Sequence, residues 1–107
     1  MEIGRFEEAL SGFKASALDN PHFKTYERIG ECYAFLGRFT EAIPYLAAAT
    51  TLNPGARAPR LLAEAWLALG FHQKAIEAAD IALLRVPGYR KALEVRAAAE
   101  AQIGRQE

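Results

Sequence analysis

Few residues in this sequence are suited to chemistry, and their spacing does not bring them together. The chain of 107 residues has one cysteine, Cys32, and two histidines, His22 and His72. A zinc site needs about four ligands at suitable spacing, so we expect no metal. A nucleophilic cysteine needs a base beside it, whereas Cys32 stands between Glu31 and Tyr33. We therefore expect a packed thiol and surface histidines at the starts of helices.

Patterns that would bind a cofactor or a nucleic acid are missing as well. Gly30 and Gly37 fit neither a dinucleotide-binding nor a phosphate-binding glycine loop. Lys plus Arg equals Asp plus Glu at 13 each. The basic residues do not form a stripe with exposed aromatics, so nothing favours nucleic acid. We predict a protein that is not an enzyme and carries no cofactor.

The composition favours helices and a single soluble domain. Alanine occurs 22 times and valine twice, which is a strong local preference for helix over strand. No run reaches the roughly 18 apolar residues of a membrane span, and the start does not predict a signal peptide. A single cysteine excludes an internal disulfide and suits a reducing compartment. We therefore favour a cytoplasmic location without membrane contact.

The chain repeats itself with a period of 33 residues. The period is marked by Gly4, Gly37 and Gly70 and by Pro21, Pro54 and Pro87. Apolar residues between each glycine and proline recur at steps of three, four and seven, which is one face of a helix. The other half of each period has the same helical spacing. Each period thus predicts a helix, a turn at a glycine with positive φ, a second helix, and a stop at proline.

Gly30 stands in the middle of a predicted helix, where glycine costs about 1 kcal/mol relative to alanine. We expect close packing to compensate, because a helix face without a side chain admits a bulky residue from its neighbour. Pro44 falls about one turn into a second helix and removes one backbone donor there.

These features resemble the tetratricopeptide repeat (TPR) family, over almost the whole chain. The residues that carry the resemblance are Tyr26, Ile29, Gly30, Tyr33, Gly37, Phe39, Ala42, Leu46, Ala49 and Pro54. The period is one residue shorter than is usual in the family. The resemblance implies an all-α fold, a right-handed α–α superhelix of stacked antiparallel helix pairs, with about six helices.

We expect one TPR-like domain over residues 1–107, built of four parts. These are a half repeat at 1–21 with a second-type helix, full repeats at 22–54 and 55–87, and a terminal solvating helix at 88–107. In the last helix, Arg96 and Glu100 take places that the repeat normally packs, which suits a helix with nothing stacked beyond it.

The first predicted helix, over residues 5–19, lacks the partner that would cover Phe6, Leu10 and Phe13. Either upstream sequence is missing or another surface covers these side chains. A homo-oligomer through this uncovered helix is therefore one expectation, and a fragment of a larger protein is the other.

The resemblance also implies that the first helix of each pair lines an inner wall that binds partners. The matching residues are Lys24, Glu27, Glu31, Phe35, Arg57, Arg60, Glu64, Leu67, Lys91 and Glu94. The steps 24, 27, 31 and 57, 60, 64 support this, because each traces one stripe of a helix. The alternative, that these are ordinary solvated charges, stays open for each residue.

We expect the basic residues Arg57, Arg60, Arg90 and Lys91 to gather toward one end of this wall. Some relatives hold a C-terminal carboxylate with a lysine–asparagine clamp, but Glu27 and Glu31 occupy the matching places and would repel it. A peptide of mixed charge fits better, with Phe35 and Leu67 as apolar contacts and arginines at its acidic groups.

The function predicted from the sequence is a non-catalytic scaffold for protein–protein interaction, which binds a peptide or protein segment in a concave groove. Two alternatives remain. The chain could be an accessory region of a larger enzyme, such as a transferase, or a self-assembling adaptor.

Overall fold

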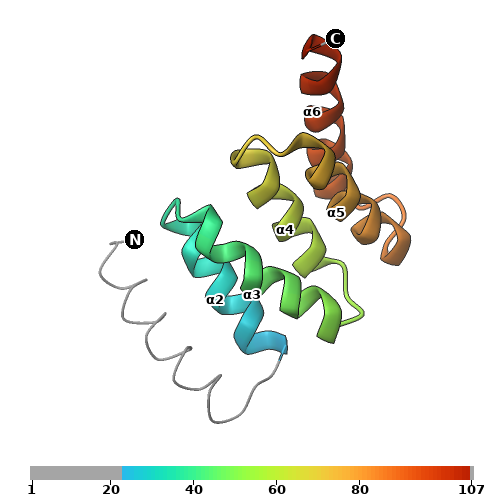
Figure 1. Ribbon diagram of the computed structural model, residues 1–107. Helices are drawn as coiled ribbons and strands as arrows, with labels where there is room; N and C mark the ends of the chain where they lie inside the picture. The colour runs from blue at the N-terminus through green and yellow to red at the C-terminus, as the bar shows by residue number, and fades with distance from the viewer. Residues whose placement is uncertain (1–22, 107) are drawn as a thin grey trace.

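The computed structural model describes residues 23–106, and these residues form five helices and no strand. Figure 1 shows them as a stack along the chain. The helices are α2 (Phe23–Phe35), α3 (Phe39–Leu52), α4 (Arg57–Ala68), α5 (His72–Arg85) and α6 (Arg90–Gln106). The all-α fold is thus confirmed. The predicted helix at 5–19, with Phe6, Leu10 and Phe13, lies outside the described residues, as does His22.

Glycines with positive φ end the first helix of each pair, as the sequence predicts. Gly37 has φ of 77° and Gly70 has φ of 85°. After Gly37, the backbone N–H of Arg38 donates to the carbonyl of Tyr33 at 2.8 Å, five residues back. The turn at Gly70 repeats this bond at 3.0 Å. Such an arrangement satisfies carbonyls that the helix end leaves open.

Two other predicted interruptions turn out differently. The last turn before α6 uses Gly88, with φ of 82°, which the 33-residue pattern did not mark. Gly104, which fits the glycine spacing, does not end a helix, because α6 continues through it to Gln106. Pro44 lies inside α3, and the helix runs on to Leu52.

Gly30 lies where α2 and α3 approach most closely. A Cβ atom placed on it would lie 2.5 Å from both Cγ and Cδ2 of Leu46 on α3. Carbon atoms in contact are normally about 3.5–4.0 Å apart. Leu46 is fully buried, so the absent side chain of Gly30 is what makes room for it. The close packing expected at this glycine is confirmed.

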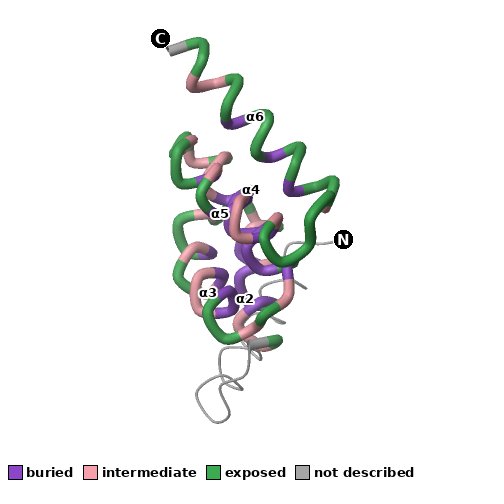
Figure 2. Tube along the Cα trace, turned by 90° about the vertical axis from the view of Figure 1, so that its right-hand side faces the viewer, coloured by how far each residue is buried: buried purple, intermediate pink, exposed green. Residues whose placement is uncertain are grey.

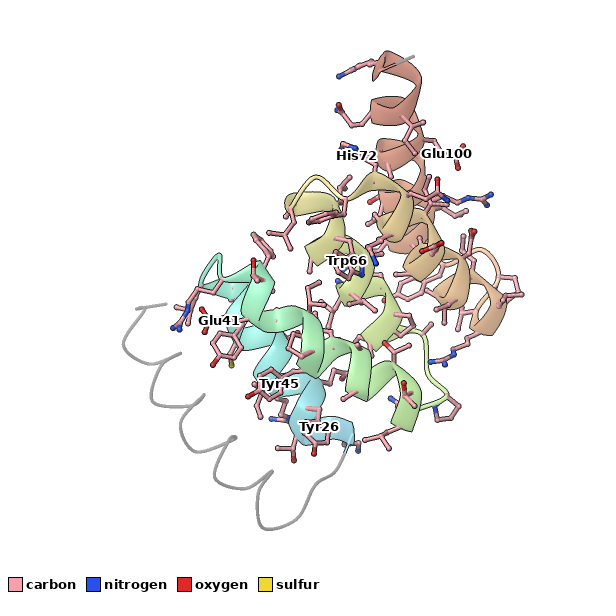
Figure 3. All side chains as sticks on the ribbon, in the orientation of Figure 1. Tyr26, Glu41, Tyr45, Trp66, His72 and Glu100 are labelled. Atoms are coloured by element: carbon pink, nitrogen blue, oxygen red, sulfur yellow. The ribbon has the colours of Figure 1, made fainter. Side chains whose placement is uncertain are left out.

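The core follows the stack as a continuous row of buried residues (Figure 2). Tyr26 and Tyr33 on α2 both contact Tyr45 on α3, with ring centroids 6.4 and 5.7 Å apart. Trp66 on α4 is partly buried and meets the Phe71 ring edge-on at 5.5 Å. Figure 3 shows these aromatic groups at two levels of the stack.

The helices form an inner and an outer layer. Each helix packs on the next along the chain, and in addition α2 contacts α4 and α4 contacts α6. The outer helices α3 and α5 do not contact each other. The stack is therefore closer on the side of α2, α4 and α6, and these three helices make the inner wall on which the predicted site residues lie.

Helix α6 is buried along one side only, through Ala92, Val95 and Ala99 (Figure 2). On another side, Nε of Arg96 lies 3.2 Å from Asp80 of α5 and 3.0 Å from Glu100. These ion pairs occupy places that the repeat pattern reserves for packing.

Arg85 ties the two helix pairs together in a way the sequence did not predict. Its Nη1 donates to the carbonyls of Asn53 at 2.8 Å and Gly55 at 2.9 Å, and Nη2 donates to the carbonyl of Thr50 at 3.0 Å. These carbonyls belong to the end of α3 and the turn after it. A cation at a helix C-terminus also interacts favourably with the helix dipole.

Candidate functional site

A hollow of about 400 Å³ lies on the inner wall, where side chains of α2, α4 and α6 meet. We call it the main hollow. It is lined by Glu31, Ala34, Phe35, Phe39, Arg57, Arg60, Leu61, Glu64, Ala65 and Lys91. Its volume falls in the range of small-ligand and side-chain pockets. Five of these lining residues are apolar and five are charged, so the surface suits a segment with both kinds of side chain.

A second hollow of about 480 Å³, the side hollow, lies beside the first and shares Glu31 and Arg57 with it. It is lined by Lys24, Glu27, Arg28, Glu31, Asn53 and Arg57. All of these side chains are polar or charged. The two hollows therefore form one surface along α2 and α4, apolar toward Phe35 and polar toward Lys24.

Arg57 is held by two glutamates of α2. Its Nη1 donates to Oε2 of Glu27 at 3.0 Å, and its Nη2 donates to Oε2 of Glu31. The Arg57 side chain is about half exposed, whereas that of Glu27 is only 12% exposed. Oε1 of Glu27 is buried and has no hydrogen-bond partner. Without Arg57, a largely buried carboxylate would lose its counter-charge, which is far more costly than losing an exposed ion pair.

Arg60 is buried and fully engaged. Its Nη1 donates to Oε2 of Glu64 at 2.5 Å, and its Nε donates to the hydroxyl of Tyr89 at 3.1 Å. Burial alone lowers the pKa of the guanidinium, but the hydrogen bonds to Glu64 and Tyr89 outweigh it and raise the pKa. The side chain is a permanent cation that stabilises the wall between α4 and the start of α6.

The expected gathering of basic residues at one end of the wall is wrong for the arginines of α4. Arg57 pairs with Glu27 and Glu31, and Arg60 pairs with Glu64, so positive and negative charges alternate. The reason is geometric, because the stripes of α2 and α4 lie side by side and long side chains reach across. These arginines hold the wall together and are not free for acidic groups of a partner.

The structure brings most of the predicted site residues together, and two lie apart. Lys24, Glu27, Glu31, Phe35, Arg57, Arg60, Glu64 and Lys91 line one or both hollows. Leu67 is partly buried and packs against the core instead. Glu94 is exposed on α6 and lines neither hollow. Whether these residues bind a partner stays a prediction.

Several lining residues were not predicted. Phe39 and Leu61 supply much of the apolar surface of the main hollow, and Tyr89 holds Arg60 from a turn. Phe39 and Leu61 fit the helical apolar pattern and were assigned to packing or left unassigned. Tyr89 is 29 residues from its partner, and no periodic signal links the two.

Other candidates for chemistry remain structural. Cys32 is buried, and its pKa is raised by burial and then by the negative charge of Glu31. His72 begins α5, at the corner where it was predicted. Among residues 23–106, no three His, Cys, Asp or Glu side chains gather to hold a metal ion. Over the same residues, no helix is long and apolar enough to cross a membrane.

Comparison with known proteins decides the family. A family model described as "Tetratricopeptide repeat" matches residues 1–57 and again 33–90, which together make up most of the chain. The chain belongs to the tetratricopeptide-repeat family. A TPR fold is known as a scaffold for protein interactions, and proteins of this family are in general non-catalytic. No curated protein sequence matches the chain.

Solved TPR structures resemble the fold closely. The crystal structure of MamA superimposes with a TM-score of 0.89 at 24% identity, covering 94% of this chain and 60% of MamA. A thermophilic TPR protein of Thermus thermophilus, TTC0263, gives 0.77 at 28% identity, with 92% and 51% covered. The chain thus spans only part of the length of either protein.

A third similar structure contains a bound peptide. It is the first TPR of Spaghetti (RPAP3) bound to the HSP90 peptide SRMEEVD, with a TM-score of 0.85 at 21% identity. The likeness covers 94% of this chain and 82% of that one. At this identity the resemblance is one of fold.

Proposed function

We propose that this TPR protein is a non-catalytic interaction module that binds a peptide or protein segment along the inner wall of α2, α4 and α6. The main hollow is the observation that carries this proposal, because it joins side chains of all three inner helices. A segment lying across the wall would contact each of them in turn. The peptide bound to the structurally similar TPR of Spaghetti gives further support for a peptide as the ligand class.

Phe35 is the side chain in the main hollow that a partner would cover. It is 70% exposed at the end of α2. Burying apolar surface stabilises a complex by about 25 cal/mol per Å², and aromatic side chains are enriched among the residues that contribute most to binding. A groove of this size suggests micromolar affinity, which corresponds to about −8 kcal/mol.

The arginines of the wall are poor probes of this function. Reversing the charge of Arg57 would put a carboxylate beside Glu27 and Glu31, and the same change at Arg60 would bury an acid beside Glu64. Either variant would lose stability as well as any ligand. Exposed residues are better suited because their replacement leaves the core intact.

The function is tested by selecting ligands from a displayed library of random peptides on the immobilised full chain. Selected peptides are then titrated against the wild type and Phe35→Ala. Leu84→Ala is the matched control, because Leu84 is 82% exposed and lines none of the hollows described here. Leu52→Ala tests a competing apolar hollow on α2 and α3, which Leu52 lines together with Tyr45.

We expect Phe35→Ala to weaken binding about tenfold, which is the effect of losing about 1.4 kcal/mol at a contact residue. Both control variants should bind as the wild type does. Loss of binding in Leu52→Ala but not in Phe35→Ala would move the site to the outer face and refute the groove.

A further inference from the structure

We propose that the segment bound in the main hollow carries an apolar side chain next to a carboxylate, and that this carboxylate meets Lys91. This inference rests on the proposed function and names the chemistry of its ligand. It starts from a comparison of the three cations that line the main hollow, namely Arg57, Arg60 and Lys91.

Only Lys91 among these cations is available to a partner. Arg57 is engaged by Glu27 and Glu31, and Arg60 by Glu64 and Tyr89. Lys91 is exposed and forms no ion pair or hydrogen bond within the described part of the chain. The main hollow therefore has one uncompensated charge, and it is positive.

The start of α6 increases this positive potential. Its first turn contains Arg90 and Lys91 and no acidic residue. Helix N-termini favour negative charge, because the unpaired N–H groups and the helix dipole make them positive. Two cations in this turn are unfavourable for the free helix. Where a protein departs from such a local rule, a functional reason is a reasonable expectation.

Glu94 does not cancel this charge. It lies one turn further along α6, outside the lining of the main hollow, and forms no ion pair among residues 23–106. A carboxylate brought by a ligand would therefore meet Lys91 and the start of α6 together. A ligand cation at the same place would be repelled.

The rest of the main hollow is apolar, which fixes the second property of the ligand. Ala34, Phe35, Phe39, Leu61 and Ala65 form the apolar part of the lining. An acidic group alone would leave this surface exposed to water, whereas an adjacent apolar side chain would cover it. We therefore commit to a peptide with an apolar residue and an Asp or Glu close to it.

The experiment uses the full chain and the peptide library described above. Enriched peptides are titrated at low salt against the wild type, Lys91→Glu and Arg90→Glu. Arg90→Glu is the matched control, because it makes the same charge change one residue away, and Arg90 does not line the hollow. Both changes place an acid at a helix N-terminus, so neither should weaken the fold.

We expect the enriched peptides to combine an apolar residue with a nearby acid. Lys91→Glu should weaken their binding about threefold to tenfold, and Arg90→Glu about twofold or less. The difference should shrink as salt screens the charges. A peptide with lysine in place of its acid should bind Lys91→Glu better than it binds the wild type.

The other outcomes separate the two proposals. Basic or uncharged peptides, or equal binding by Lys91→Glu and the wild type, would overturn the ligand chemistry while Phe35→Ala still shows the groove in use. Absence of any enriched peptide, or binding that Phe35→Ala does not change, would overturn the proposed function and this inference with it.

Discussion

The contact between Gly30 and Leu46 leads to a prediction whose sign is opposite to the usual one. In a helix interior, alanine in place of glycine is normally favourable by about 1 kcal/mol. At Gly30 the new Cβ would lie 2.5 Å from Cγ and Cδ2 of Leu46, so Leu46 would have to withdraw by about 1 Å to reach ordinary contact distance. Overfilling a packed core costs about 1–3 kcal/mol. The balance is a net loss of up to about 2 kcal/mol for Gly30→Ala.

Gly104 offers a matched control within the same protein. It also lies inside a helix, but a Cβ there would meet nothing within 4 Å. Gly104→Ala should therefore stabilise the chain by up to about 1 kcal/mol, less near the frayed end of α6. Urea unfolding followed by circular dichroism gives both values. With a slope of about 2 kcal/mol per molar urea, the two midpoints should differ by roughly 1 M.

A double-mutant cycle tests whether Leu46 is the cause. Leu46→Ala removes both atoms that the new Cβ would meet and should itself cost about 2–5 kcal/mol. In that background, Gly30→Ala should become stabilising, which gives a coupling of about 1–3 kcal/mol. If Gly30→Ala raises the midpoint as Gly104→Ala does, or if the two changes simply add, the reasoning from this contact is refuted.

Three further predictions concern stability and reactivity. Arg85→Met, which loses the bonds to the carbonyls of Asn53 and Gly55, should lower the unfolding free energy by about 1–2 kcal/mol in urea titrations; an unchanged midpoint would show those bonds to be worth nothing net. Trp66→Ala should cost about 3 kcal/mol by circular dichroism, since the ring packs on the core, and a loss below about 1 kcal/mol would contradict that packing. Because burial raises the pKa of Cys32, its thiol should react with a disulfide reagent at pH 8 far more slowly in the folded chain than in urea. The same shift should reduce stability as the pH rises above the pKa of the unfolded thiol, and rapid labelling of the folded chain would disprove the burial.

The sequence predicted the helices and their turns better than it predicted the site. Gly37 and Gly70 were correctly expected to have positive φ, because a residue without Cβ at that point of the period has few other uses. Gly104 fits the same spacing but lies within α6, since no second helix follows it in the described residues. Spacing alone therefore marks where a turn is possible, and packing beyond it decides whether a turn forms. The division into repeats and a terminal helix stays a prediction.

The inner wall was predicted as a set of residues but not as a set of contacts. The helical stripes correctly place Glu27, Glu31 and Arg57 on the two hollows. The stripes did not show that these three side chains bind one another, nor that Leu67 would turn to the core. A stripe gives the direction of a side chain from its own helix, and the neighbouring helix determines its partner.

By itself, the sequence determined which segments become helices, where they stop and which face is buried. Helical period, glycine φ and the restriction before proline act within a few residues, so the local pattern contains them. The tertiary structure decided which charges are engaged and which cation remains free. Arg57 finds Glu27 across 30 residues of chain, and Arg60 finds Tyr89 across 29. Such pairs depend on how far one helix pair is offset from the next, to within the length of a side chain, and that offset is fixed only when the buried faces of all the pairs have packed.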